Sequence, residues 1–233
     1  MSDIHGNAIA LDAVLQDVRR NGIEHVLIAG DFVGYYYHAD TVFELLSTWT
    51  WEGVQGNHDA IFVALSQGTD DVRSYRTQYG HALDLALQTL SAHDQKLLAA
   101  LPITREYTRD GQHILLCHGS PWQQDAYVYP NAQPEIFMRI ARLGYDVVVL
   151  GHTHYPFTRR EGTTLIVNPG SVGQPRDVGG LASWAILDPL KMTATNRRVR
   201  FDPSSTIADV QVHDPELPYL TEVFTRRQRP YAA

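Results

Sequence analysis

Apolar residues near the amino terminus recur with two different periods. Between residues 8 and 18 they return every three or four positions, which predicts a helix with Asn7 as its N-cap. A continuous apolar run at 26–29 indicates a buried strand. A second helical pattern covers residues 40–48, and another short strand ends near Val54. The amino-terminal quarter therefore alternates helix and strand.

The rest of the chain continues this alternation and then becomes strand-rich. Residues 60–101 have mostly helical spacing, and a helix is also expected over 134–143. Strands are expected at 103–108, 113–117, 146–150, 164–167, 183–187 and 192–201. This order predicts an α/β domain with stacked or mixed sheets. We expect one domain over residues 1–233, with residues from about 205 to 233 forming a peripheral helical extension.

Composition and charge narrow the class of protein. The chain has 233 residues and a net charge of −7, so we expect no nucleic-acid binding. No apolar run approaches the roughly 18 residues of a membrane span, and no leader segment is evident, so we expect neither a membrane anchor nor secretion. The single cysteine, Cys117, lies in an apolar run and is expected to be a buried thiol. These features favour a cytoplasmic protein.

Four predicted strands end in the same kind of polar motif. Ligands bind beyond the carboxyl ends of strands in open α/β sheets, and glycine there lets the backbone turn sharply. Together with Asp3 and His5, the motifs bring two candidate ligand carboxylates (Asp3 and Asp31), one amide and five histidines to one edge. The motifs are Gly30-Asp31, Gly56-Asn57-His58-Asp59, His118-Gly119 and Gly151-His152-Thr153-His154.

Imidazole and carboxylate groups are ligands for divalent transition metals. One such ion needs three or four ligands, so this set is large enough for two ions with one bridging carboxylate. A pair of ions can clamp the attacking and leaving oxygens of a phosphoryl displacement. A lone histidine is usually structural. Coincidence is a poor explanation for five histidines at successive strand ends. The residues therefore predict a dinuclear metallohydrolase with two divalent ions, for which Mn, Fe, Zn, Ni and Co all fit.

In this order, Asp3-x-His5 and the four strand-end motifs resemble the signature of the calcineurin-like metallophosphoesterase superfamily. The segment from Asn168 to Asp177, Asn-Pro-Gly-Ser-Val-Gly-Gln-Pro-Arg-Asp, resembles the small prokaryotic phosphodiesterase branch of that superfamily. The resemblance implies a four-layer α/β/β/α sandwich with two mixed β-sheets.

The resemblance also implies a role for each site residue. The first metal is expected on Asp3, His5 and His154, the second on Asn57, His118 and His152, and Asp31 is expected to bridge them. His58 is not a ligand in the family and faces the phosphate. The protein phosphatases of the superfamily have Asp-Arg-Gly where this chain has Gly34-Tyr35-Tyr36. The carboxylate that orients the catalytic histidine in those enzymes is therefore missing, which leaves the partner of His58 open.

The expected reaction is hydrolysis of a phosphodiester by a metal-bridging hydroxide, with His58 assisting the leaving group. Asn57 and Arg176 are candidate substrate contacts, although a surface ion pair is an equal alternative for Arg176. Other activities left open are a phosphomonoesterase, a dinucleoside polyphosphate hydrolase and a metal-free scaffold. The substrate is expected to be a small phosphoester. It would be nucleotide-derived if a group of aromatic residues forms a rim around the site. For several of these aromatic residues, packing in the core is the slightly favoured alternative. Those residues are Tyr35, Tyr36, Tyr37, Trp122, Tyr127 and Tyr129.

Only Met1 and Ser2 precede Asp3. In the family the Asp-x-His motif ends the first β-strand, and a strand usually has about 5–6 residues. We therefore expect the natural chain to begin several apolar residues earlier. We also expect Asp3 and His5 to be poorly held in the chain as given.

Overall fold

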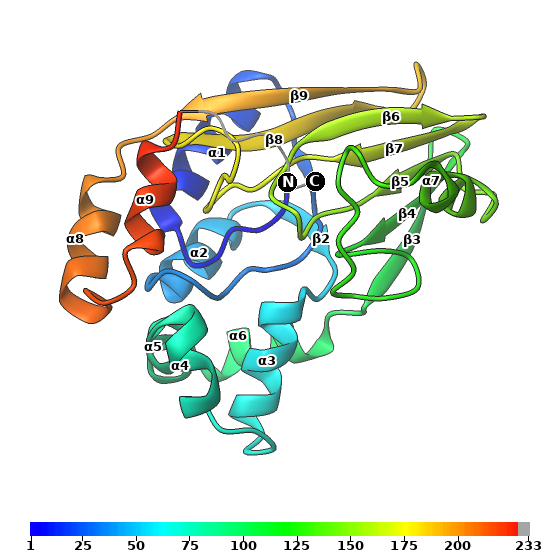
Figure 1. Ribbon diagram of the computed structural model, residues 1–233. Helices are drawn as coiled ribbons and strands as arrows, with labels where there is room; N and C mark the ends of the chain where they lie inside the picture. The colour runs from blue at the N-terminus through cyan, green and yellow to red at the C-terminus, as the bar shows by residue number, and fades with distance from the viewer. Residues whose placement is uncertain (228–233) are drawn as a thin grey trace.

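Two layers of β-strands stack face to face in the computed structural model, which describes residues 1–227 (Figure 1). The larger layer is a five-stranded sheet in which β4, β5 and β7 are parallel and both edge strands are antiparallel. Its strands, in spatial order, are β3 (Thr104–Arg109), β4 (Gln112–Cys117), β5 (Val147–Val149), β7 (Thr164–Asn168) and β6 (Phe157–Glu161).

The second layer consists of two strand pairs. The parallel pair is β1 (His25–Ile28) with β2 (Thr50–Gly53), and the antiparallel pair is β8 (Leu181–Asp188) with β9 (Thr193–Arg200). Two short segments, residues 1–3 and 171–173, lie between β1 and β8. The Ala29 N–H donates to the Met1 carbonyl (2.9 Å), and the Val172 N–H donates to the Ser2 carbonyl (3.0 Å). The Ser183 N–H donates to the Ser171 carbonyl (2.9 Å), which continues the layer into β8.

The amino-terminal residues are firmly held, so the expectation that Asp3 and His5 are poorly held was wrong. The physical reason is hydrogen bonding on both sides of the segment, since the Met1 ammonium also donates to the Leu27 carbonyl (2.8 Å). Asp3 and His5 are fully buried. A cavity of about 850 Å³ adjoins Met1, between the start of β1 and the end of β8. The earlier natural start of the chain stays a prediction.

Helices cover both outer faces of the two strand layers. On one side, α1 (Ala8–Arg20) and α2 (Ala39–Leu46) bury an apolar stripe against the β1 and β8 layer. The Asn7 side chain accepts from the Ala10 N–H (3.2 Å), which starts α1 at the predicted residue. On the other side, Phe137 and Ile140 of α7 (Pro134–Ala141) pack against Leu115 of β4. The predicted α/β/β/α sandwich is confirmed.

Further helices enclose the edge where the strand-end motifs lie. The predicted helical region 60–101 forms α3 (Asn57–Ser66), α4 (Arg73–Tyr79), α5 (Ala82–Thr89) and α6 (Ala92–Ala100). In the predicted carboxy-terminal extension, α8 (Ser204–His213) and α9 (Tyr219–Thr225) are helical, and Leu220 and Phe224 are buried in the same core as Tyr36. Residues 228–233 of that extension lie outside the described residues. The single-domain boundary stays a prediction.

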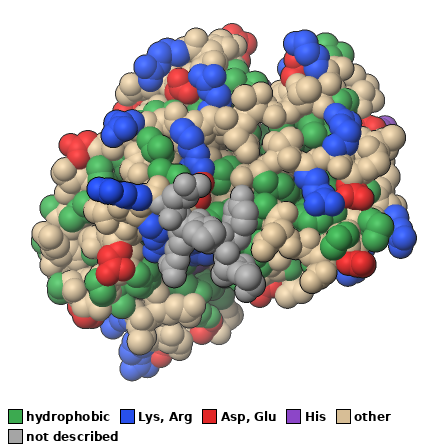
Figure 2. All heavy atoms as spheres, turned by 45° about the horizontal axis from the view of Figure 1, so that its top comes forward, with side chains coloured by type: hydrophobic (Ala, Val, Ile, Leu, Met, Phe, Trp, Pro, Cys, Tyr) green, Lys and Arg blue, Asp and Glu red, His purple; other side chains and the backbone are tan. Residues whose placement is uncertain are grey.

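One strand was not predicted from the sequence. β6 reads Phe-Thr-Arg-Arg-Glu and lies at the edge of the five-stranded sheet, where charged side chains face solvent. Within residues 1–227, none of the helices has the length and apolar character that a membrane span requires. On the face drawn in Figure 2, Lys and Arg side chains are scattered among acidic and uncharged ones rather than gathered into one basic patch.

Candidate metal centre

All seven residues predicted to hold metal come together at the carboxyl ends of the strands. Residues 1–3 lead to Asp3 and His5, and the loops after β1, β4 and β5 carry most of the others. Asn57 is the first residue of α3 and is half-buried. The other six are buried: Asp3, His5, Asp31, His118, His152 and His154.

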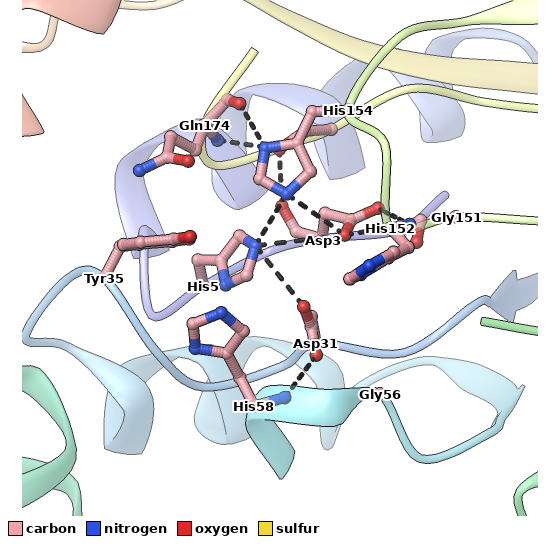
Figure 3. Close-up of polar contacts among 12 residues, drawn as sticks. Asp3, His5, Asp31, Tyr35, Gly56, His58, Gly151, His152, His154 and Gln174 are labelled. Atoms are coloured by element: carbon pink, nitrogen blue, oxygen red, sulfur yellow. Dashed lines mark hydrogen bonds and ion pairs between the residues drawn. The ribbon is translucent and has the colours of Figure 1, made fainter. Parts of the chain in front are cut away.

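Three of these residues form a first cluster. The Nε2 atoms of His5 and His154 lie 3.0 Å apart, and His154 Nε2 lies 3.3 Å from Asp3 Oδ1. Figure 3 shows His5 between His154 and Asp31, with its ring nitrogen directed toward both. Asp3, His5 and His154 thus offer one carboxylate oxygen and two imidazole nitrogens within 4.8 Å of one another.

A second cluster shares its carboxylate with the first. His118 Nε2 lies 3.3 Å from Asp31 Oδ2 and 3.0 Å from Asn57 Oδ1. The same Asp31 oxygen lies 3.6 Å from His5 Nε2 of the first cluster. His152 completes the group with Asp31 and His118. Asp31 Oδ2 therefore lies between the two clusters.

The histidines are oriented as metal ligands are. The Nδ1 atoms of His5, His118 and His154 lie 3.2, 2.6 and 2.7 Å from the backbone carbonyls of Val33, Ala29 and Gln174, respectively. A ring that donates from Nδ1 keeps Nε2 as a lone-pair donor to metal. His152 Nε2 is buried with no hydrogen-bond partner among the described residues. This donor set fits divalent metal ions.

The backbone at these positions is strained. A non-glycine residue with φ between 50° and 70° is uncommon, and such strain gathers at functional sites. Seven described non-glycine residues have positive φ, and five of them are predicted ligands. Those five are Asp3 (55°), His5 (53°), Asp31 (58°), His152 (65°) and His154 (62°).

Burial and mutual charge shift the pKa values of the metal-free site. Burial lowers the pKa of His58 and His152 to about 4. Burial also acts to lower the pKa of His118, but the Asp31 carboxylate outweighs it and raises that pKa to about 10. For Asp31, burial acts to raise the pKa, and the charge of His118 outweighs it and holds the pKa well below its usual range. Without metal, His118 and Asp31 thus each stabilise the charged form of the other.

Aromatic rings surround His58, and within residues 1–227 no carboxylate hydrogen-bonds to its ring, although the Asp31 carboxylate lies nearby. Its ring centroid lies 4.8 Å from that of His5, 4.7 Å from Tyr35 and 4.4 Å from Tyr79. Its Nδ1 is buried without a hydrogen-bond partner among residues 1–227. The adjacent Asp59 points away and binds backbone N–H groups instead. Tyr79 was not among the predicted site residues, because nothing in the sequence pattern of α4 relates it to the strand ends.

Arg176 lies beside the site and forms no surface ion pair. Its Nη2 donates to Tyr35 Oη (3.2 Å), and no ion pair within residues 1–227 includes it. The Tyr35 ring packs edge-on against His5, with centroids 4.6 Å apart (Figure 3). Within the described residues, the guanidinium therefore faces a tyrosine hydroxyl at the metal-ligand cluster rather than a carboxylate, and its contact with substrate stays a prediction.

The tyrosines considered for an aromatic rim divide into two groups. Tyr36 and Tyr37 point away from the site, where their hydroxyls donate to the Leu220 carbonyl (3.0 Å) and the Asp214 carboxylate (2.7 Å). Tyr127 is 52% exposed, and its ring centroid lies 4.2 Å from that of His152. Tyr129 is parallel to Tyr127 at 5.6 Å.

Trp122 does not join this rim. The Arg139 guanidinium lies over its ring, 3.8 Å from the centroid, in a separate hollow of about 360 Å³ that Tyr127 also lines. The rim at the metal-ligand cluster thus consists of Tyr35, Tyr79, Tyr127 and Tyr129.

Known proteins share this architecture. The chain is 31% identical over 220 residues to an uncharacterized protein of Methanocaldococcus jannaschii, covering 87% of this chain and 86% of that protein. It is 24% identical over 190 residues to phosphodiesterase YfcE of Escherichia coli, covering 80% and 84% of the two chains. The crystal structure of a metallophosphoesterase from Sphaerobacter thermophilus is 26% identical, with a TM-score of 0.76 and 96% of each chain covered.

The sandwich and its cluster of histidine, aspartate and asparagine side chains define a metal-dependent phosphoesterase. Residues 1–191 match the calcineurin-like phosphoesterase superfamily domain, and the chain belongs to that family. The resemblance drawn from the strand-end motifs is therefore confirmed, as is the enzyme class.

Proposed function

We propose that the protein is a dinuclear phosphodiesterase that acts on a small, monoanionic phosphodiester. The observation that carries this proposal is the position of Asp31 Oδ2 between two sets of ligand atoms. Asp3, His5 and His154 would hold one divalent ion, and Asn57, His118 and His152 the other. When bound, two such ions lower the pKa of water toward 7 and neutralise charge on the phosphoryl oxygens.

His58 would act on the leaving oxygen. It lies beside both ligand clusters, within 4.8 Å ring-to-ring of His5, yet its Nδ1 makes no hydrogen bond. The rings of Tyr35 and Tyr79 hold its plane, so the imidazole needs no carboxylate partner. A ring N–H in this position can donate to the oxygen that departs from phosphorus.

Arg176 would bind a non-bridging phosphoryl oxygen. Its described partner is a neutral hydroxyl, so its positive charge is free to pair with an anion. Asn57 would contact the substrate from the second cluster. The preference for a diester is supported by the Escherichia coli relative, which is named a phosphodiesterase.

Tyr127 supports a substrate with an aromatic group. It is exposed and adjoins His152, so a ring on the substrate could stack on it at the mouth of the site. Nucleotide-derived diesters fit this arrangement. A metal-free scaffold would not need the seven ligand positions, all of which are filled here.

The proposal is tested with a substrate panel. Bis-p-nitrophenyl phosphate, p-nitrophenyl phosphate and a dinucleoside polyphosphate are each assayed with Mn²⁺, Zn²⁺, Co²⁺, Ni²⁺ and Fe²⁺. We expect the diester to have the highest kcat/KM with at least one metal. A higher kcat/KM for the monoester or for the polyphosphate would contradict the diester assignment. No turnover of any substrate would contradict the proposed activity itself.

The role of His58 is tested in the same assay. His58→Ala should keep its bound metal and lose about 10²–10⁴-fold in kcat. His93→Ala, at an exposed position on α6, serves as the control and should retain full activity. Wild-type turnover by His58→Ala would remove this residue from the mechanism.

A further inference from the structure

Asp59 gathers four backbone N–H groups from two loops onto one carboxylate. Its Oδ2 accepts from the N–H groups of Asp31 (2.8 Å) and Gly56 (2.9 Å). Its Oδ1 accepts from those of Phe32 (2.9 Å) and Val33 (3.2 Å). Asp59 is fully buried, so water does not compete for these donors.

The loop after β1 needs such an acceptor because of its shape. Asp31 has φ of 58°, and the N–H groups of residues 31–33 turn toward the same point. Buried N–H groups without an acceptor are costly. The two loops also touch directly, because a Cβ on Gly56 would collide with the Asp31 carboxylate. No side chain other than Asp59 fills the role of acceptor among the described residues.

A reciprocal bond orients the Asp31 side chain. The N–H of His58 donates to Asp31 Oδ1 (2.9 Å), which leaves Oδ2 as the oxygen that lies between the two ligand clusters. Asp59 thus fixes the backbone of Asp31, and the start of α3 fixes its carboxylate. Both contacts come from the same turn of helix, since Asp59 occupies the third position of α3.

We propose that Asp59 is a positioning residue that sets the bridging carboxylate Asp31 in place for metal binding. It acts through the backbone of residues 31–33 and through Gly56, and it touches neither metal nor substrate. This inference rests on the proposed dinuclear centre. It assigns Asp59 a task distinct from orienting His58, which it does not contact through its side chain.

The test measures binding of Mn²⁺ alone by isothermal titration calorimetry to the metal-free wild-type protein and to Asp59→Asn. Asparagine offers one acceptor oxygen, and its amide hydrogens would face N–H donors. At least two of the four bonds are therefore lost. We expect Mn²⁺ affinity to fall about 10–100-fold, the usual effect of losing a group that supports a metal ligand. Wild-type affinity and stoichiometry in Asp59→Asn would overturn the proposal.

Asp146→Asn is the matched control for a general loss of stability. The Asp146 carboxylate also accepts a hydrogen bond from a backbone N–H, that of His113 (2.8 Å). It lies at the amino-terminal ends of β4 and β5, whereas the ligand clusters lie beyond their carboxyl ends. Both variants are titrated at a temperature at which circular dichroism shows them folded. Asp146→Asn should bind Mn²⁺ as the wild type does. An equal loss of affinity in both variants would overturn the proposal, because instability alone would then explain it.

If Asp59→Asn does not fold, Asp59→Glu takes its place. Glutamate keeps two acceptor oxygens, but its longer chain displaces them from the 31–33 N–H groups, so weaker Mn²⁺ binding is again expected and unchanged binding overturns the proposal. If the wild type binds only one Mn²⁺, the dinuclear centre fails. The effect of Asp59 on the ion that does bind still decides this inference.

Discussion

Arg176 reaches the metal-ligand cluster through a tyrosine: its Nη2 donates to Tyr35 Oη at 3.2 Å, and the Tyr35 ring packs 4.6 Å from that of His5. The bond holds a guanidinium beside the site without neutralising it. A carboxylate in place of the hydroxyl would compete with a phosphoryl group for the same charge. This pairing explains how one arginine stays available for an anionic substrate.

Removing the guanidinium should therefore weaken substrate binding. We expect Arg176→Met to lower kcat/KM for bis-p-nitrophenyl phosphate by about 10–150-fold, the range for a hydrogen bond to a charged group. Tyr35→Phe should lower it by about 2–10-fold, because only the orienting bond is lost. Arg105→Met is the control, since Arg105 pairs with Glu52 away from the site (2.9 Å). An unchanged kcat/KM in Arg176→Met would exclude contact with the substrate.

The rim is tested by comparing two diesters. Tyr127→Ala should raise KM for a nucleotide diester more than it raises KM for methyl p-nitrophenyl phosphate. Only the nucleotide carries a base, and stacking is worth roughly 1–3 kcal/mol per base. Trp122→Ala is the comparison variant, because the Arg139 guanidinium already lies over its ring. If Tyr127→Ala changes both KM values equally, base stacking at the rim is ruled out.

Gly34 keeps space open beside two histidines. A Cβ there would lie 2.6 Å from His58 Nδ1 and 2.9 Å from His5 Nδ1, so Gly34→Ala must displace at least one ring. We expect kcat to fall at least tenfold. Gly144→Ala is the control, since Gly144 also has positive φ (83°) but nothing within 4 Å of its Cβ position. That variant should be destabilised by about 1–2 kcal/mol and keep its turnover. Equal kcat values in the two variants would contradict the steric argument.

Metal removal should destabilise the fold, because only the native state assembles the ligand set. At a Mn²⁺ concentration of 100 times Kd, each bound ion stabilises the native state by about 2.7 kcal/mol. For a chain of this size, even one such ion raises Tm by roughly 5–11 °C over the EDTA-treated protein. Differential scanning calorimetry measures this difference, which should shrink in His154→Ala. The same Tm with EDTA and with Mn²⁺ would show that the cluster does not bind metal in solution.

The sequence predicted an α/β domain with stacked or mixed sheets and the convergence of the site, because both follow from local patterns, whereas the four-layer order followed only from the family resemblance. Apolar runs such as 26–29 and 147–150 identify buried strands, and a polar motif at a strand end must lie at the sheet edge. β6 was missed because an edge strand with charged residues lacks that signal. Tyr79 and the direction of Asp59 depend on how α3 and α4 pack, which no local pattern records.

The central claim is that seven residues hold two metal ions bridged by Asp31. A crystal structure of the Mn²⁺-loaded protein, with anomalous scattering from manganese, tests it most directly. We expect two peaks about 3.5–4 Å apart, one bound by Asp3, His5 and His154 and the other by Asn57, His118 and His152, with Asp31 bound to both. A single peak at saturating Mn²⁺, or two peaks that do not share Asp31, would contradict the account.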